Sequence, residues 1–387
     1  MKTCVFIWCL ICLVATEGAA QLGQVLSFRG QASAWANVNP GNDMPLWMGA
    51  RYLPQANLDL DLGEGRLAGF EVSANLNGSG GLRFFDSLSV EGRMKPYRVW
   101  ARYATNQLEL RIGLQKINFG SASMLRPLMW FDQVDPRDPL QLTDGVWGLL
   151  GRYYFLNNAN IWVWALYGNE GPKTWETGPT TNKKPEYGGR FQMPVARGEA
   201  AISFHHRKAD QHFESVLMPH ASCLPVFMTN IPENRYGFDA KWDVEVGLWV
   251  EATWINKRQE AGPFTNMQLF NLGADYTFGI GNGLHLVAEH LLFSLDQKAF
   301  AFERKTNFTA TSVSYPIGIL DHISGIFYYD WTNGNLYSFA NWHRQFNRVS
   351  FYLMAFWNPE TFQLPQQSAD TRLFSGKGFQ IMLVYNH

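Results

Sequence analysis

The most regular feature of the chain is an alternation of apolar and polar residues with a period of two. In residues 236–243, one face carries Tyr236, Phe238, Ala240 and Trp242, and the other carries Gly237, Asp239, Lys241 and Asp243. Residues 270–278 and 108–114 alternate in the same way, and in residues 97–103 the apolar face carries Tyr97, Val99 and Ala101. A β-strand sends successive side chains to opposite faces, whereas a helix repeats every 3.6 residues. The pattern therefore predicts an all-β chain whose strands each have one apolar face.

About 18 such segments can be placed along the chain. They lie near 24–37, 47–61, 67–77, 97–105, 107–116, 146–155, 160–168, 187–193, 199–207, 235–243, 246–256, 268–278, 284–293, 307–315, 322–331, 336–342, 348–357 and 376–386. The gaps between them alternate: short ones include Asn157–Ala159 and Gly279–Gly283, and long ones include 78–96, 117–145 and 208–234. Bacterial outer-membrane barrels alternate short periplasmic turns with long external loops in this way.

We therefore predict a transmembrane antiparallel β-barrel of about 18 strands, with 16 as the alternative. One connection departs from the alternation, because Asn333-Gly334 signals a tight hairpin where a long loop is expected. Aromatic residues also gather at one end of alternate segments, where they would form a periplasmic girdle at the lipid headgroups. They are Tyr103, Phe155, Phe191, Trp242, Phe278, Tyr315, Trp342 and Tyr385. A soluble sandwich shares the alternation, but this placement of aromatics favours the barrel.

The N-terminus predicts export from the cytoplasm. Lys2 precedes an apolar run from Cys4 to Ala15, and the small residues Gly18 and Ala20 follow. This is the layout of a secretory signal peptide. We expect residues 1–20 to be the signal and residues 21–387 to be the barrel, located in the bacterial outer membrane. Three of the four cysteines fall in the signal and leave Cys223 alone, so no internal disulfide is expected.

Residues 117–145 are unusual for an external loop. They include many apolar residues, three prolines that restrict the backbone, and the candidate constriction residues Arg126, Trp130, Asp132, Asp135, Arg137 and Asp138. Loops of this length in compact proteins are usually functional. We predict that this loop folds into the lumen and narrows it. The alternatives are an external lid packed on neighbouring loops and a contact between subunits.

This stretch also carries a resemblance. Residues 110–120 read Leu-Arg-Ile-Gly-Leu-Gln-Lys-Ile-Asn-Phe-Gly, and Leu125-Arg126-Pro127 and residues 131–139 (Phe-Asp-Gln-Val-Asp-Pro-Arg-Asp-Pro) follow. The stretch resembles porin-like outer-membrane proteins of Bacteroidetes, and its Arg-x-Gly-x-Gln-x-x-x-x-Gly core is similar to a strand of alginate-export barrels. The resemblance implies a barrel for passive diffusion or export. Such barrels are inserted by a barrel-assembly machinery that commonly reads a terminal aromatic residue; here Tyr385 is followed by Asn386 and His387.

The polar faces of the segments supply the candidate pore-lining residues. They are Arg98, Arg102, Glu109, Arg111, Arg152, Arg190, Asp239, Lys241, Glu245, Glu251 and Asp275. Four arginines fall on consecutive strands from 97 to 155, whereas acids gather on strands 235–278. Opposed basic and acidic walls would create a transverse field that orients polar solutes. Across residues 244–254 the alternation turns Leu248 toward lipid and Glu251 toward the lumen.

These observations predict a channel rather than an enzyme. No serine, histidine and acid in the sequence form a recognisable catalytic set, and no metal site or cofactor is expected. The net charge of −1 argues against a nucleic-acid partner. The predicted function is passive passage of small polar or anionic solutes, with saccharides among the candidates, by a monomer or a homotrimer embedded in outer-membrane lipid. The alternative is a non-conducting barrel that serves as a scaffold or subunit of a surface or export assembly.

Overall fold

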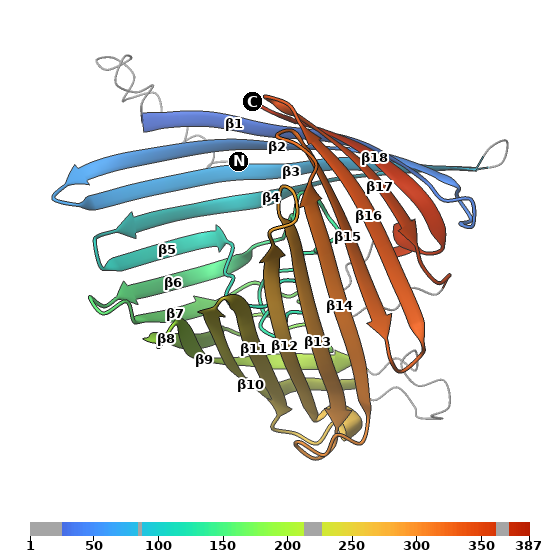
Figure 1. Ribbon diagram of the computed structural model, residues 1–387. Helices are drawn as coiled ribbons and strands as arrows, with labels where there is room; N and C mark the ends of the chain where they lie inside the picture. Colours follow the sequence, from blue (N-terminus) through green and yellow to red (C-terminus); the bar gives the residue numbers. More distant parts are fainter. Residues whose placement is uncertain (1–24, 84–86, 213–226, 361–370) are drawn as a thin grey trace.

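A computed structural model describes residues 25–83, 87–212, 227–360 and 371–387. These residues form one antiparallel sheet of eighteen strands (Figure 1). The strands are β1 (Leu26–Val38), β2 (Leu46–Gly63), β3 (Arg66–Arg83), β4 (Ser87–Ala104), β5 (Leu108–Gln115), β6 (Val146–Tyr154), β7 (Asn160–Leu166), β8 (Glu186–Val195), β9 (Gly198–His212), β10 (Phe227–Val244), β11 (Val246–Lys257), β12 (Asn266–Phe278), β13 (Leu284–Asp296), β14 (Lys305–Pro316), β15 (Asp321–Asp330), β16 (Asn335–Gln345), β17 (Val349–Trp357) and β18 (Lys377–Asn386). In the part of the chain that the structure describes, the connections contain two short 3-10 helices, η2 (Gly262–Phe264) and η3 (Thr371–Phe374).

The sheet closes on itself. Each strand pairs with the next one along the chain, and β1 pairs with both β2 and β18, so that Ala32 lies between Tyr52 and Tyr385. Closure satisfies the backbone hydrogen bonds that an open sheet edge would leave exposed to lipid. The prediction of an 18-stranded antiparallel barrel is confirmed. Within the described ranges, no helix is long and apolar enough to cross a membrane.

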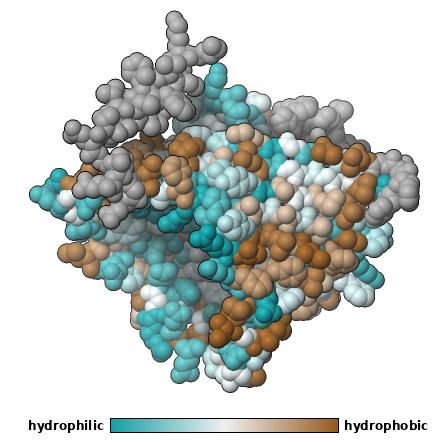
Figure 2. Space-filling model, turned by 90° about the horizontal axis from the view of Figure 1, so that it is seen from above, coloured by the Kyte–Doolittle hydropathy of each residue, from teal (hydrophilic) through white to brown (hydrophobic). Residues whose placement is uncertain are grey.

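The two faces of the barrel wall differ in polarity. On the outer face, Leu272 in the middle of β12 is 63% exposed, and Phe238 and Leu248 are exposed as well. Asp239 follows Phe238 on β10 and points to the inner face, where it is only 1% exposed. Figure 2 shows brown hydrophobic residues over broad areas of the surface. A soluble monomer rarely exposes apolar patches of this extent, and a hydrocarbon environment matches them.

The two ends of the barrel differ in their connections. At one end the turns are short: Glu64-Gly65 joins β2 to β3, and Glu245 alone joins β10 to β11 in a left-handed conformation (φ 77°). The other end carries the long connections 116–145 and 167–185. We call these the periplasmic and external ends, following the usual orientation of outer-membrane barrels. The predicted tight turn at Asn333-Gly334 is confirmed, with Gly334 at φ 68°.

Two of the predicted external loops are shorter than expected. Residues 78–96, predicted as a loop, belong mostly to β3 and β4, which stay paired as far as Arg83 and Ser87. The glycines at 78, 80 and 81 suggested a loop, but they lie within the ladder, and residues 88–94 keep the alternation of a strand. The predicted loop 208–234 is shortened in the same way, because β9 runs to His212 and β10 begins at Phe227.

Tyr97 lies on the opposite face from the one predicted. The ladder between β3 and β4 pairs Ser73 with Arg98 and Ala74 with Pro96, so Tyr97 is an extra residue in β4. Such a bulge breaks the period of two and reverses the faces on either side of it. Tyr97 therefore lines a cavity inside the barrel. The signal-peptide prediction and Cys223 lie outside the described residues.

Candidate functional site: the lumen and its two inner loops

The connection between β5 and β6 runs through the interior of the barrel (Figure 1). We call residues 116–145 inner loop 1. The Thr253 hydroxyl on β11 donates to the Pro127 carbonyl (3.0 Å), and Arg98 on β4 donates to the Thr143 carbonyl (2.9 Å). The loop therefore reaches from one inner wall to the opposite one. Its side chains at Leu125, Leu128 and Trp130 are fully buried.

Glu289, a buried residue of β13, holds the first bend of inner loop 1. Its carboxylate accepts hydrogen bonds from the backbone N–H groups of Ser123 (2.7 Å), Met124 (3.1 Å) and Leu125 (2.5 Å). The Ser123 hydroxyl donates to the same carboxylate (3.0 Å). Hydrogen bonds to an ionised acceptor are about twice as strong as neutral ones. One side chain on the wall thus fixes three consecutive residues of the loop.

Glu251 on β11 holds the next part of the same loop. Its carboxylate accepts hydrogen bonds from the N–H groups of Ala122 (2.7 Å) and Leu128 (3.2 Å). Glu251 is fully buried under the loop. The sequence analysis predicted that Glu251 lines an open pore on the inner face. The residue does lie on the inner face, but its carboxylate binds the loop and not solvent.

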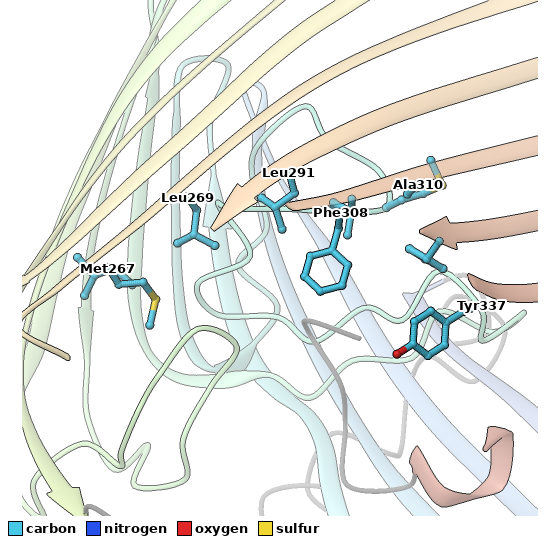
Figure 3. Close-up of a cluster of buried hydrophobic side chains, with 10 residues drawn as sticks. Met267, Leu269, Leu291, Phe308, Ala310 and Tyr337 are labelled. Atoms are coloured by element: carbon cyan, nitrogen blue, oxygen red, sulfur yellow. The ribbon is translucent and has the colours of Figure 1, made fainter. Parts of the chain in front are cut away.

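Apolar packing joins the loop to both sides of the lumen. On one side, Met124 and Leu125 pack into a buried cluster with inward side chains of β11 to β16. The other members are Ile255, Met267, Leu269, Leu291, Phe308, Ala310, Tyr328 and Tyr337. Figure 3 shows the cluster along the wall, with Met267, Leu269, Leu291, Phe308, Ala310 and Tyr337 labelled. On the other side, the Phe131 ring lies 5.4 Å from the Trp164 ring of β7 and 5.0 Å from the His205 ring of β9. Burial of these apolar side chains stabilises the loop inside the barrel.

The charged residues of inner loop 1 pair largely with one another. Arg126 and Asp132 form an ion pair at 2.9 Å, and Arg137 and Asp135 form one at 2.6 Å. Asp138 accepts the N–H groups of Leu140 and Leu142, at 3.0 and 3.3 Å, and burial raises the pKa of its carboxyl. These pairs fix the shape of the loop, so fewer of its charges remain for a solute than the sequence suggested.

A second inner loop, residues 167–185, which we call inner loop 2, was missed by the sequence analysis. The Trp175 indole N–H donates to the Arg126 carbonyl (2.9 Å), and Thr174 donates to the Asp132 carbonyl (3.2 Å), so this loop packs on inner loop 1. Sequence reasoning treated 169–186 only as a long gap. The signal that could have found it is the set of inward charges on β9 and β10, which require buried partners.

Buried ion pairs anchor inner loop 2 to the wall. Glu176 lies 3.0 Å from Arg207 on β9 and 2.6 Å from Arg235 on β10, and Lys173 lies 3.0 Å from Glu186 at the start of β8. Burial alone would raise the pKa of Glu176, but Arg207, Lys173 and Arg235 outweigh it and hold the pKa below its ordinary value. The carboxyl therefore stays ionised at neutral pH.

Three of the four predicted wall arginines gather near the periplasmic end. The Arg111 guanidinium lies 4.7 Å from the Trp100 ring, and that of Arg152 lies 3.9 Å from the Trp162 ring. Glu109 pairs with Arg111 at 2.8 Å and with Arg152 at 3.7 Å. The side chains of Arg102, Arg111 and Arg152 keep 16–29% of their surface exposed. Arg98 does not join them, because it is buried against inner loop 1.

The predicted acidic residues of the wall are less available to a solute than the arginines. Asp239 forms a buried bidentate pair with Arg190, which cancels its charge. Lys241 and Asp275 are partly exposed on the wall near the periplasmic end. Glu245 was predicted to line the pore, but it forms the exposed turn between β10 and β11. The reason is that β10 ends at Val244 and β11 begins at Val246, so Glu245 belongs to neither strand and does not form part of the barrel wall.

Comparison with solved structures finds barrels of the same architecture. The Acinetobacter baumannii protein OccAB2 superposes with a TM-score of 0.53 at 9% identity, covering 94% of this chain and 97% of that one. Wzi of Escherichia coli superposes with a TM-score of 0.52 at 10% identity, covering 93% and 84%. No protein-family model and no curated protein matches the chain.

The chain has the fold of a porin-like outer-membrane β-barrel. Closure of the sheet and its apolar outer face suit this fold to the bacterial outer membrane, where the protein is located.

Proposed function

We propose that the protein is an outer-membrane channel for small polar or anionic solutes. The observation that carries this proposal is inner loop 1, which crosses the lumen while the charged wall near the periplasmic end stays in contact with solvent. An 18-stranded wall by itself encloses a wide aqueous lumen. A loop fixed across it converts that lumen into a passage that selects by size and charge.

The arginine cluster supports a preference for anions. Arg102, Arg111 and Arg152 lie beside Asp59 and Glu109, and Glu71 interacts with both Arg98 and Arg111. With Arg98 counted, four arginines face three acids, so the local charge is positive. Their guanidinium groups stack on or near Trp100 and Trp162, which holds them in place without neutralising them. A positive patch in a low-dielectric wall attracts anionic solutes.

The test is electrical. The purified full chain, reconstituted in planar bilayers, is expected to give steady single-channel conductance. Liposomes that contain it are expected to swell in small sugars, amino acids and organic acids but not in large oligosaccharides. A protein that folds, inserts and remains silent in both assays would contradict the proposal.

A second candidate, a non-conducting scaffold of a surface assembly, is favoured by the interlocking of the two inner loops. The ion pairs of Glu176 with Arg207 and Arg235 fasten one loop, and Trp175 fastens it to the other. Wzi, which shares the fold, is described as a carbohydrate-binding barrel involved in capsule assembly. The same bilayer recordings separate the two candidates, since a scaffold would not conduct.

Further parts of the proposal concern origin and partners. The likeness to Bacteroidetes porin-like proteins and alginate-export barrels, and insertion by a barrel-assembly machinery, stay predictions from the sequence. For the oligomer, we propose a monomer or a homotrimer in outer-membrane lipid. Sedimentation of the detergent-solubilised protein, with bound detergent accounted for, distinguishes these two states.

A further inference from the structure

A cavity of about 260 Å³ lies inside the barrel on the external side of the arginine cluster. Residues 133–144 of inner loop 1 form one wall, and the inner faces of β1 to β4, β17 and β18 form the other. Leu373 and Phe374, from the connection between β17 and β18, border it at the external end. Small-molecule sites begin at roughly 300 Å³, so this cavity suits one small ring-sized solute rather than a polymer.

Among the described residues, one polar atom of Asn75 and one of Arg51, both in the wall of this cavity, have no hydrogen-bond partner. Asn75 on β3 is 5% exposed, and its side-chain oxygen is buried without a hydrogen bond. Arg51 on β2 has a buried Nε without a hydrogen bond. Both line the cavity, and the ladder pairs Arg51 with Asn77, two residues from Asn75 on the same strand. Both atoms are buried in the wall rather than open to the cavity. Buried polar groups without partners are costly, so a rotation of either side chain toward a solute hydroxyl in the cavity would supply the missing hydrogen bond.

The charges around the cavity are balanced. Lys95 pairs with Asp144 at 2.6 Å, and Arg137 pairs with Asp135 at 2.6 Å. The remaining cation, Arg51, is balanced by Asp138, which also lines the cavity. A cavity whose formal charges cancel does not select an ion by its net field. The solute that matches it is neutral.

The rest of the lining is aromatic and apolar. Trp35 and Tyr97 line the cavity, and Leu140, Met354 and Met382 form an apolar patch beside Trp35. Ring sugars present C–H groups on their faces and hydroxyls around their edges. An aromatic or thioether surface suits the faces, and an amide oxygen and a guanidinium suit the hydroxyls.

From this arrangement we infer that the cavity is a binding site for a single neutral pyranose sugar, held by Asn75 and Arg51 at the external side of the lumen. The inference deepens the proposed channel function and rests on it, because the site would bind a solute on its way through the barrel. It differs from the arginine cluster, which faces the periplasmic end and favours anions.

Saturation-transfer NMR on the full chain in detergent micelles tests the site, with D-glucose, D-glucuronate and L-alanine as probes. Glucose is expected to give a saturable signal that exceeds those of glucuronate and alanine. Asn75→Leu and Arg51→Gln are each expected to weaken glucose binding at least tenfold. Asn160→Leu is the matched control, because Asn160 is also buried with a partnerless oxygen but lies on β7, away from the cavity.

A folded barrel migrates differently on gels before and after heating, and this difference shows which variants are folded. If Asn75→Leu misfolds, Arg51→Gln still tests the site. Glucose binding no stronger in the wild type than in the folded variants would overturn the inference, as would stronger binding of glucuronate or alanine. Bilayer recordings keep the two proposals distinguishable. If the protein binds glucose but does not conduct, the proposed channel function is wrong and the proposed sugar site stands. If it conducts but does not bind glucose, only the proposed sugar site is wrong.

Discussion

At the scale of single residues, depth in the membrane decides what an outward position tolerates. Leu272 and Leu248 both point outward, but Leu272 lies six residues from either end of β12, whereas Leu248 is two residues from the periplasmic start of β11. A cationic side chain on the lipid-facing surface lowers the free energy of unfolding far more at the bilayer midplane than near the headgroups. The same substitution at these two positions therefore measures the register of the barrel in the bilayer.

We expect Leu272→Arg to lower the free energy of unfolding by roughly 2–4 kcal/mol and Leu248→Arg by about 1 kcal/mol or less. The measurement is reversible urea unfolding in lipid vesicles, followed by tryptophan fluorescence. Equal costs at the two positions would show that the barrel sits at a different depth from the one its strand ends indicate.

Glu289 is the residue on which the position of inner loop 1 depends most directly. Its carboxylate accepts hydrogen bonds from Ser123, Met124 and Leu125, and a glutamine there would turn an N–H donor toward those donors. Each hydrogen bond to a charged group contributes about 1.5–3 kcal/mol. We expect Glu289→Gln to leave the barrel folded and to increase open-channel current noise and substates.

The matched control is Glu245→Gln, the same chemical change in the exposed turn between β10 and β11. It should record like the wild type. If Glu289→Gln is as quiet as this control, apolar packing alone holds the loop and the carboxylate is dispensable.

At the scale of elements, inner loop 1 and the barrel wall are separable. All the strand pairing lies outside residues 116–145, and β5 and β6 pair directly from Leu108–Tyr153 to Gln115–Val146. Segments outside the hydrogen-bonded framework can often be removed without loss of the fold. The loop can therefore be tested as a constriction without dismantling the pore.

Deletion of residues 121–140, with a short Gly/Ser linker across the gap, should leave the barrel folded. The barrel should be less stable, because the apolar cluster around Leu269 and Phe308 becomes exposed to water. Conductance should rise and discrimination between solutes should fall, as measured by single-channel recording and liposome swelling. A folded deletion variant that conducts like the wild type would mean that the loop does not limit passage.

At the scale of the whole molecule, the distribution of charge along the lumen sets ion preference. Arg102 and Arg152 are the wall arginines with the weakest ion pairs, at 3.6 Å to Asp59 and 3.7 Å to Glu109. Both lie near the periplasmic end, where the passage meets solvent. They should act on permeating anions through space rather than through the fold.

Replacing both by glutamine should lower the preference for anions, seen as a shift of reversal potential in a salt gradient. The shift should be largest near 0.1 M salt and shrink at 1 M, since the Debye length falls from about 10 Å to about 3 Å. Reversal potentials that do not change at low salt would rule out the cluster as the selectivity element.

The sequence by itself determined the wall of the barrel. A period of two fixes which side chains share a face, as for Leu248 outside and Glu251 inside, and the alternation of short and long gaps fixes strand number and orientation. These features are local, so they can be read from neighbouring residues. The period failed at the bulge of Tyr97 and at the turn of Glu245, where local geometry broke it, and loop length failed where glycines such as Gly78 lie within a ladder.

Only the tertiary structure decided what fills the lumen. Inner loop 2 rests on ion pairs such as Glu176 with Arg207, whose partners are 31 positions apart, and inner loop 1 rests on Glu289, more than 160 positions from Ser123. Whether a wall charge faces a solute, like Arg152, or a loop, like Arg98, depends on how the closed barrel folds its connections inward. No periodicity encodes such contacts, because they arise between segments that meet only after the ring of eighteen strands has closed.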